Sequence, residues 1–319
     1  MKTPACILAT ILSLLLFSGT PQAHAADSPA PPKKVLVVTT TAGFRHSSIP
    51  TAEKILEQLA QKSGDFTVEF VRQPPGKPAP PPKPAVLKPD SSPADQAAFQ
   101  AATQKHEADL ATYKTAEAAW ETTLAQALMK LSPDSLKNYD GLIFCSTTGD
   151  LPIPDKEGLL AWIKEGHAFI AIHAGSDTFH HWPGYIAMLG GEFQNHKQQV
   201  GVDCINVDPK HPANIHLGPT LTITQEEIYR FKNYDASHEH ELLVLDKDPN
   251  DKTPGHFPVS WCHAYGQGRV FYTSLGHRED IWDTDPALPG RVNPPAVAEA
   301  FQAHLLGGIR WALGLANSE

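Results

Sequence analysis

The chain has 319 residues, and its 26 Lys and Arg against 35 Asp and Glu give a formal net charge of −9 with neutral histidines. This balance argues against a nucleic-acid-binding protein, because phosphate neutralisation needs clustered Lys and Arg. The length suits one large α/β domain with an additional segment.

The first 25 residues are typical of an export signal rather than of a folded element. Lys2 supplies the positive end, residues 7–17 are apolar, and residues 23–25 read Ala-His-Ala, a typical cleavage site. The apolar stretch is too short for a stable membrane anchor. We therefore expect a signal peptide over residues 1–25, a Pro-rich tether over residues 26–32, and a periplasmic or secreted protein with no membrane insertion after cleavage.

The mature chain begins with a β-α-β pattern. Residues 35–40 form an apolar, β-branched run. Residues 48–63 have apolar side chains at helical spacing, ending at Gly64, and residues 66–71 alternate like a strand. This pattern indicates an α/β fold with a right-handed crossover.

Residues 74–133 differ in composition from the segments on either side. Residues 74–93 are dense in Pro and Lys and cannot form a helix or a central strand. Residues 94–131 are rich in Ala, Gln, Glu and Lys and carry one apolar stripe. This pattern predicts a long amphipathic helix that is interrupted at most once. We interpret 74–133 as an insertion, and favour a packing appendage over a lid or partner surface, because such a stripe usually means ordinary burial.

The second half of the chain is organised around the strand predicted at residues 168–172. A predicted helix over residues 157–165 precedes it, and every residue of the strand is apolar, as in a parallel sheet buried on both faces. The run ends at His173-Ala174-Gly175. Ligands of open α/β sheets bind beyond the carboxyl ends of the strands, so His173 is the first functional candidate.

Further elements follow from the same patterns. The other predicted strands are residues 140–145, 200–207, 226–231, 242–245, 258–263 and 269–274, with a hairpin at 265–268, and the other predicted helices are 183–189 and one that begins at Pro294-Pro295. The three cysteines of the mature chain, Cys145, Cys204 and Cys262, share no metal-binding spacing and lie among apolar residues. We expect them to be small buried hydrophobic side chains.

Polar and ionisable groups follow four of the predicted strands. These loops are Gly43-Phe44-Arg45-His46, Ser146-Thr147-Thr148-Gly149-Asp150, His173-Ala174-Gly175-Ser176-Asp177 and Gly276-His277-Arg278-Glu279-Asp280. In a parallel sheet all four gather at one edge, where His196, Glu227 and Tyr229 could reach the same place. Their recurrence at predicted strand ends, rather than any one of them, indicates a site.

Several ordered motifs resemble one known family, the ThuA-like (trehalose utilisation) family. They are Phe44-Arg45-His46, Thr147-Thr148-Gly149, Ile172-His173-Ala174-Gly175-Ser176-Asp177-Thr178, Gly190-Gly191, His211-Pro212, Glu227-x-Tyr229, Val259-x-Trp261 and the run from Gly268 to His277. The resemblance implies an α/β domain over residues 33–314, interrupted by the insertion. Its expected fold is a flavodoxin-like three-layer sandwich of the class I glutamine-amidotransferase-like type, with a mostly parallel central sheet. It also implies a link to disaccharide or glycoside catabolism, particularly of oxidised 3-keto sugars.

A glutaminase is excluded on chemical grounds. That reaction needs a thiolate at the turn after the strand, where this chain has His173. Cys145 follows another strand and has no evident base. A triad of Ser176, Asp177 and His180 or His181 crowds its members into six residues, which disfavours the geometry that a triad requires.

We interpret the site as that of an exported carbohydrate-active enzyme acting on 3-keto-glycosides or glycosides, by proton abstraction and elimination or by hydrolysis. The catalytic candidates are His173 or Glu227 as the base and Arg45 and His277 as oxyanion partners. The substrate-binding candidates are Phe44, His46, Thr148, Asp150, Ser176, Asp177, Trp182 and Tyr229. The alternative is a non-catalytic periplasmic protein that binds a small saccharide and serves a sugar oxidoreductase or transporter.

A divalent metal ion is the one cofactor that the residues suggest. His46, His173, His196 and His277 could form a nitrogen-rich site for zinc or a similar ion, which would polarise a ketone. The four residues are far apart in the sequence and show no local ligand spacing, so only the fold can decide whether they meet.

Overall fold

The computed structural model describes residues 1–2 and 31–318. The expected signal peptide and nearly all of the tether therefore lie outside the described residues. The chain divides into two units, Met1–Pro31 and Pro32–Glu319, and all helices and strands described here belong to the second unit. None of these helices is long and apolar enough to cross a membrane.

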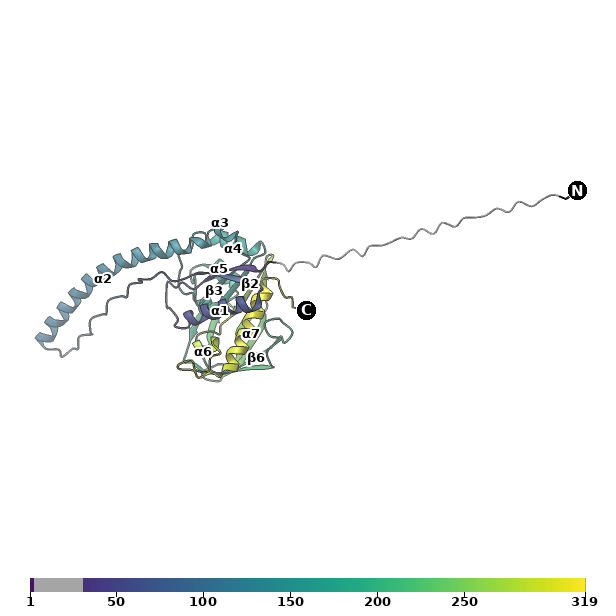
Figure 1. Cartoon of the computed structure of the whole chain (residues 1–319). Coiled ribbons are helices and arrows are strands. Elements are labelled where there is room, and N and C mark those ends of the chain that lie inside the picture. Colours follow the sequence, from purple (N-terminus) through teal and green to yellow (C-terminus); the bar gives the residue numbers. More distant parts are fainter. Residues whose placement is uncertain (3–30, 319) are drawn as a thin grey trace. The chain divides into compact units, whose positions relative to one another are not determined.

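A nine-stranded sheet forms the centre of the second unit (Figure 1). Its order is β2-β1-β3-β4-β11-β10-β9-β6-β7. The strands, in that order, are Phe66–Val71, Lys33–Val38, Gly141–Cys145, Ala168–Ile172, Gly268–Thr273, Pro254–Tyr265, His240–Lys247, Val200–Asn206 and Thr220–Glu226. The first five are parallel, in the 2-1-3-4-5 order of flavodoxin-like sheets. The α/β fold expected from the sequence is confirmed.

The other half of the sheet is antiparallel. The predicted hairpin is present, with Tyr265 paired to Gly268, and it turns the sheet from parallel β11 to antiparallel β10. Strands β9, β6 and β7 continue antiparallel beyond it. A separate two-stranded sheet pairs β5 (Glu192–His196) with β8 (Tyr229–Lys232).

Helices cover both faces of the sheet, which makes three layers. On one face lie α1 (Ile49–Ser63), α6 (Glu279–Trp282) and α7 (Pro295–Ala312), whose apolar side chains join one buried cluster (Figure 1). On the other face lie α3 (Pro133–Leu136), α4 (Lys156–Lys164), α5 (Pro183–Leu189) and the end of α2 (Pro93–Leu128), in a second cluster. Cys145, Cys204 and Cys262 are free and buried in the protein, as predicted.

Helix α7 packs closely on its neighbours at two residues that have no side chain. A Cβ atom at Gly307 would overlap the Pro212 carbonyl oxygen, and one at Gly308 would overlap the Phe271 ring of β11. Glycine costs helix propensity, so the close approach is the physical reason to have it at these positions.

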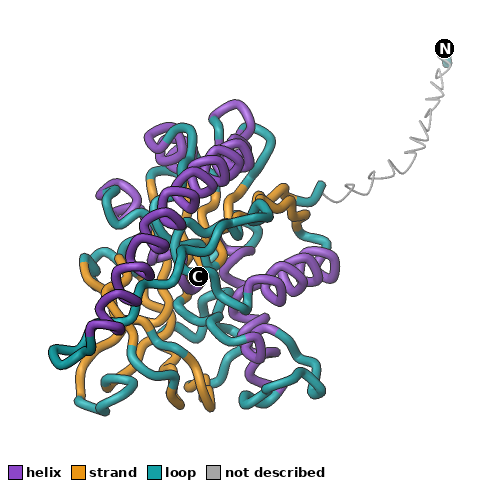
Figure 2. The backbone as a smooth tube through the Cα atoms, turned by 90° about the vertical axis from the view of Figure 1, so that its left-hand side faces the viewer, coloured by secondary structure: helices purple, strands orange, loops and turns teal. Residues whose placement is uncertain are grey.

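The insertion forms one long helix, α2, which continues into a 3₁₀ turn at Met129–Leu131. Ser92 begins α2 with a reciprocal capping box to Asp95. Only Trp120, Leu124 and Leu128 are buried in α2, so the expected apolar stripe packs at the C-terminal end alone. The Pro-rich segment leads out to the start of α2, and α2 runs back beside it toward the sheet (Figure 2). Trp120 Nε1 donates to the Pro74 carbonyl oxygen at 3.2 Å.

One predicted strand, residues 226–231, is divided in the structure. β7 ends at Glu226 and β8 begins at Tyr229, with Glu227 and Ile228 between the two sheets. The sequence pattern missed this break because Ile228, Tyr229 and Phe231 favour a strand and neither glycine nor proline interrupts the run. The break brings Glu227 to the edge where β1, β4 and β11 also end.

Candidate metal centre

Three histidines from distant parts of the chain meet at the carboxyl edge of the parallel strands. His46 follows β1, His173 follows β4 and His277 follows β11. Their ring centroids are 4.7 Å (His46 to His173), 5.2 Å (His46 to His277) and 5.3 Å (His173 to His277) apart. Three of the four loops singled out in the sequence therefore converge on one point.

The orientation of His173 is set by the main chain. Its φ angle is 51°, in the left-handed region, and its side chain is fully buried. Nδ1 donates to the Ser274 carbonyl oxygen at 2.8 Å, an assignment that follows because a carbonyl can only accept. In the neutral ring Nε2 then carries the lone pair, and it points toward His46 Nε2 at 3.2 Å and His277 Nδ1 at 3.3 Å.

Glu227 supplies the fourth group of the cluster. Its Oε1 lies 3.2 Å from His277 Nδ1 and 3.9 Å from His173 Nε2. Its Oε2 lies 2.9 Å from His196 Nδ1, which is also 3.0 Å from the Lys197 carbonyl oxygen. The fourth place in the cluster therefore belongs to Glu227, and the expectation of four histidine ligands is corrected. His196 contacts Oε2 of this carboxylate, the oxygen that does not face His173 and His277.

The four side chains fit a divalent metal ion. One ligand atom from each of His46, His173, Glu227 and His277 lies within 4.8 Å of the others. Ligands at about 2.0–2.1 Å from a tetrahedral zinc ion are about 3.3–3.4 Å apart, and the shortest separations here are 3.2, 3.2 and 3.3 Å. Backbone support of His173 and carboxylate contact with His196 are outer interactions of the kind that metal ligands have.

The protonation of the cluster favours metal binding. Burial, and then the neighbouring His277, lower the pKa of His46 to about 4. Burial and the two neighbouring histidines also hold the pKa of His173 well below its usual range. Burial lowers the pKa of His277 too, but the Glu227 carboxylate outweighs it, so that pKa is raised. Two neutral rings next to a carboxylate leave lone pairs available to a cation.

Tyr229 borders the cluster on the side of the small sheet. Its hydroxyl donates to His173 Nε2 at 3.2 Å, and its ring packs against Phe193 at 4.4 Å and stacks with His196 at 6.0 Å. Burial, and then Glu227, keep the pKa of Tyr229 well above its usual range, so the phenol stays protonated. Tyr229 is therefore a hydrogen-bond donor directly beside the candidate metal site.

Other expected site residues support loops instead. Arg45 donates to the Thr39 carbonyl oxygen at 2.8 Å, and Thr148 Oγ1 donates to the Phe44 carbonyl oxygen at 2.7 Å. Ser176 bonds to the Tyr272 hydroxyl, which donates to the His173 carbonyl oxygen. Trp182 is only 6% exposed and stacks on Tyr185 within the core, so its face is not open to a sugar ring.

Three other expected residues are at least partly exposed. Phe44 is 66% exposed, with its ring edge-on to His46 at 4.8 Å. Asp177 Oδ1 is 2.7 Å from His180 Nε2, and Asp150 Oδ2 is 3.0 Å from His181 Nδ1. Phe44 therefore borders the cluster, whereas Asp177 and Asp150 are paired with histidines outside it.

Sequence reasoning missed Glu226. This carboxylate is fully buried, and its Oε1 accepts from the backbone N–H of Gly276 at 2.9 Å and of His277 at 2.7 Å. Burial raises the pKa of Glu226 to about 7. A signal was present, because side chains of adjacent strand residues point to opposite faces, so one member of Glu226-Glu227 had to turn inward.

Cys145 is unsuited to nucleophilic chemistry. Its thiol is buried at the end of β3, and burial raises its pKa. The thiol therefore stays protonated, in agreement with the exclusion of a glutaminase.

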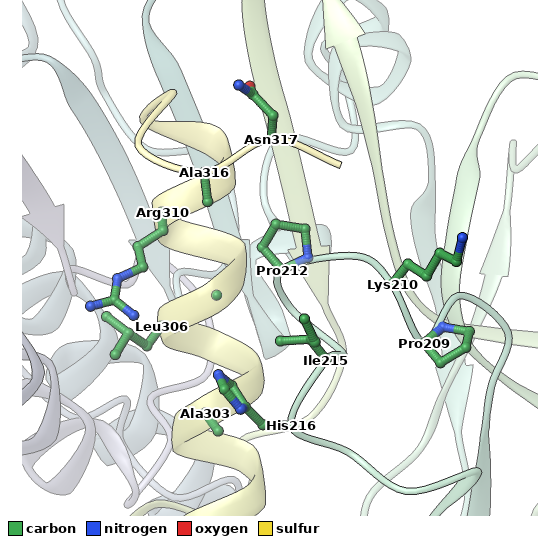
Figure 3. Close-up of a pocket in the computed structure, with 11 residues that line it drawn as sticks. Pro209, Lys210, Pro212, Ile215, His216, Ala303, Leu306, Arg310, Ala316 and Asn317 are labelled. Atoms are coloured by element: carbon green, nitrogen blue, oxygen red, sulfur yellow. The ribbon is translucent and has the colours of Figure 1, made fainter. Parts of the chain in front are cut away.

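A cavity of about 670 Å³ lies away from this cluster, between α7 and residues 209–216 (Figure 3). Its lining includes Lys210, Ile215, Leu306 and Arg310, and none of the four candidate ligands. The Arg310 guanidinium is paired with Asp65 at 2.6 Å. The cavity and the histidine cluster are separate features.

Comparison with known proteins identifies the family. The family model for ThuA, described as trehalose utilisation, matches residues 88–312. No curated protein matches the chain. A solved ThuA-like protein from Parabacteroides merdae has a TM-score of 0.58 at 17% identity, covering 90% of this chain and 92% of that one. Another from Bacteroides uniformis has a TM-score of 0.55 at 16% identity, covering 92% and 95%. The matched segment includes three of the four candidate ligands, His173, Glu227 and His277. The chain belongs to the ThuA family, which is linked to trehalose utilisation.

Proposed function

We propose that the protein is a divalent-metal-dependent enzyme of glycoside breakdown, acting on saccharides that carry a ketone. The observation that carries the proposal is the spacing of 3.2–3.3 Å between ligand atoms of His46, His173, His277 and Glu227 in a buried cluster. When bound, the ion would polarise a sugar carbonyl oxygen and stabilise the charge of its enolate.

The chain's own residues suit an elimination. A ketone at C3 acidifies the C2–H bond, and a base that takes this proton leaves an enolate. The electron pair then forms the C1–C2 double bond as the ketone re-forms, and the glycosidic oxygen leaves C1. The departing oxygen needs one proton, and the Tyr229 hydroxyl, which lies 3.2 Å from His173 Nε2, is a protonated donor beside the cluster that could supply it.

His196 is the base in this proposal. The sequence suggested His173 or Glu227 as the base. Both are candidate metal ligands, and binding the ion would occupy the lone pairs that a base needs to take up a proton. His196 Nδ1 lies between the Lys197 carbonyl oxygen and Glu227 Oε2, so Nε2 keeps the lone pair. The side chain is 43% exposed, which leaves that nitrogen accessible to substrate.

Export and partnership belong to the same proposal. The signal-like residues 1–25 support a periplasmic or secreted location. An oxidised sugar substrate requires a sugar oxidoreductase upstream, because the described residues include no group that could oxidise a secondary alcohol by themselves.

The test is a screen of oxidised and unoxidised disaccharides by mass spectrometry, with and without a chelator. Release of a monosaccharide from oxidised substrates, lost on chelation and in His173→Ala, is expected. His238→Ala changes an exposed histidine paired with Asp235 and is the matched control. Unchanged turnover in His173→Ala, or saccharide binding without any product, would overturn the proposal.

A further inference from the structure

The turn that carries His277 has a conformation that only glycine adopts easily. Gly276 has a φ angle of 122°, and a Cβ atom there would lie 3.1 Å from the Trp282 ring and 3.4 Å from Ile172 Cγ2. The turn immediately precedes a candidate ligand, so whatever holds it in place also places His277 Nδ1.

The peptide groups of this turn are held on both sides. The Gly276 carbonyl oxygen accepts from Ser48 Oγ at 3.0 Å and from Trp282 Nε1 at 2.9 Å. The N–H groups of Gly276 and His277 both donate to Glu226 Oε1. Ser48 lies two residues after His46, so the same contacts connect the His46 loop, the His277 turn and the end of β7.

Burial removes water as an alternative partner for these hydrogen bonds. Ser48, Glu226 and Trp282 are fully buried, so water does not replace a lost partner. Glu226 therefore provides an acceptor for two N–H groups that have no other partner in the turn.

We propose that Glu226 is a positioning residue, which holds the Gly276–His277 turn so that His277 Nδ1 faces Glu227 and His173, and thereby sets the metal affinity of the centre. The two adjacent glutamates then have different tasks, since Glu226 binds the backbone of the turn and Glu227 meets the side chain that the turn carries. The part of this inference that concerns affinity rests on the proposed metal centre, whereas the placement of the turn does not.

The first test measures the affinity of the full mature chain for Zn²⁺ and Co²⁺ by competition with a chelator. Glu226→Leu removes the acceptor, and we expect affinity to fall about 10- to 100-fold, as for other residues that support metal ligands. The visible spectrum of the Co²⁺ form should change with it. Glu226→Gln keeps an oxygen acceptor and should retain most of the affinity.

Glu192→Leu is the matched control. Glu192 is also a buried glutamate, but it binds His180, Lys232 and Asn233 and makes no contact with the turn. Its replacement should lower stability without a comparable loss of affinity. If Glu226→Leu does not fold, Glu226→Asp decides, because it keeps the charge and withdraws the oxygen by one methylene.

The second test needs no metal. Hydrogen exchange at the amides of Gly276 and His277 should become at least tenfold faster in Glu226→Leu or Glu226→Asp, while exchange in β11 stays unchanged. Unaltered exchange at these two amides would overturn the positioning role. If the parent chain binds no metal, the proposed function fails, and the exchange result still decides whether Glu226 holds the turn.

Discussion

At the scale of single residues, one hydrogen bond decides which nitrogen of His173 faces the cluster. Because Nδ1 donates to the Ser274 carbonyl oxygen, Nε2 is left with its lone pair among His46, His277 and Glu227. His196, by contrast, meets the cluster only through Glu227. The two histidines, both possible metal ligands from the sequence, therefore have different places in the structure.

This difference predicts opposite effects of two substitutions on metal binding. His173→Ala should abolish stoichiometric Zn²⁺ binding, because it removes a central ligand. His196→Ala should keep the bound ion with a loss of affinity of about tenfold, in line with other outer contacts, while turnover falls at least 100-fold if His196 is the base. Elemental analysis of protein purified without a His-tag measures the first effect. Loss of metal in both variants would restore His196 as a ligand.

His211 predicts a pH dependence of stability. Its Nδ1 accepts from the Ala213 N–H at 3.1 Å, so the fold needs the neutral ring, and burial lowers its pKa to about 4. Between pH 6.5 and 4 the unfolded chain takes up a proton at this residue and the folded chain does not. The contribution of His211 to folding stability is therefore complete above pH 6.5 and is lost as the pH drops toward 4. The loss for this one group is about 3 kcal/mol.

Urea unfolding at pH 7, 5.5 and 4.5 checks this expectation. His211→Gln cannot take up the proton, so the difference in unfolding free energy between the parent and this variant should shrink as the pH falls. A difference that stays constant over this range would contradict it.

At the scale of elements, the insertion shows that an apolar stripe is not buried along its whole length. Phe99 and Tyr113 remain partly exposed, whereas Trp120, Leu124 and Leu128 pack into the core cluster. Lys77 ties the Pro-rich segment to the loop after β1 by donating to the carbonyl oxygens of Ala42 at 2.9 Å and Gly43 at 3.1 Å. These contacts favour the packing appendage expected from the sequence.

Trp120 is expected to be the main anchor of the insertion. Trp120→Ala should lower the free energy of unfolding by about 3–5 kcal/mol, as for other buried large aromatic side chains. Phe99→Ala, on the same helix but partly exposed, should cost much less. Equal losses measured by urea unfolding would mean that the exposed part of α2 also packs on the protein.

The close packing at the α7 glycines predicts that replacing Gly308 by alanine lowers stability, although alanine is the better helix former. Gly308→Ala would gain about 1 kcal/mol in a free-standing helix, but the new Cβ overlaps the Phe271 ring. Overpacking of this kind costs about 1–3 kcal/mol, so a net loss of stability is expected. Phe271→Leu in the same chain should recover part of that loss, and a stabilised single variant would contradict the close packing of α7.

At the scale of the whole molecule, the candidate ligands come from both halves of the sheet. His46, His173 and His277 follow strands of the parallel half, and Glu227 follows β7 at the far antiparallel edge. A bound ion would therefore connect segments that are distant both along the chain and across the sheet.

This placement predicts that metal stabilises the whole fold. Zn²⁺ at a free concentration about 100 times its dissociation constant should add about 2.7 kcal/mol and raise the melting temperature by several degrees. A chelator should reverse the rise, and His173→Ala should show none. A rise of equal size in His173→Ala would assign the effect to another site.

The sequence by itself determined the α/β class, the β-α-β opening, the insertion, the hairpin and the loops that carry His46, His173 and His277. Each of these depends on local periodicity, turn residues or the rule that parallel strands end at one edge. Only the tertiary structure decided the antiparallel half of the sheet, the break after Glu226, and the choice of Glu227 over His196. These depend on which strands pair and which buried N–H groups need an acceptor. Such contacts are made between segments that are separate in the chain, and they leave no periodic trace in the sequence.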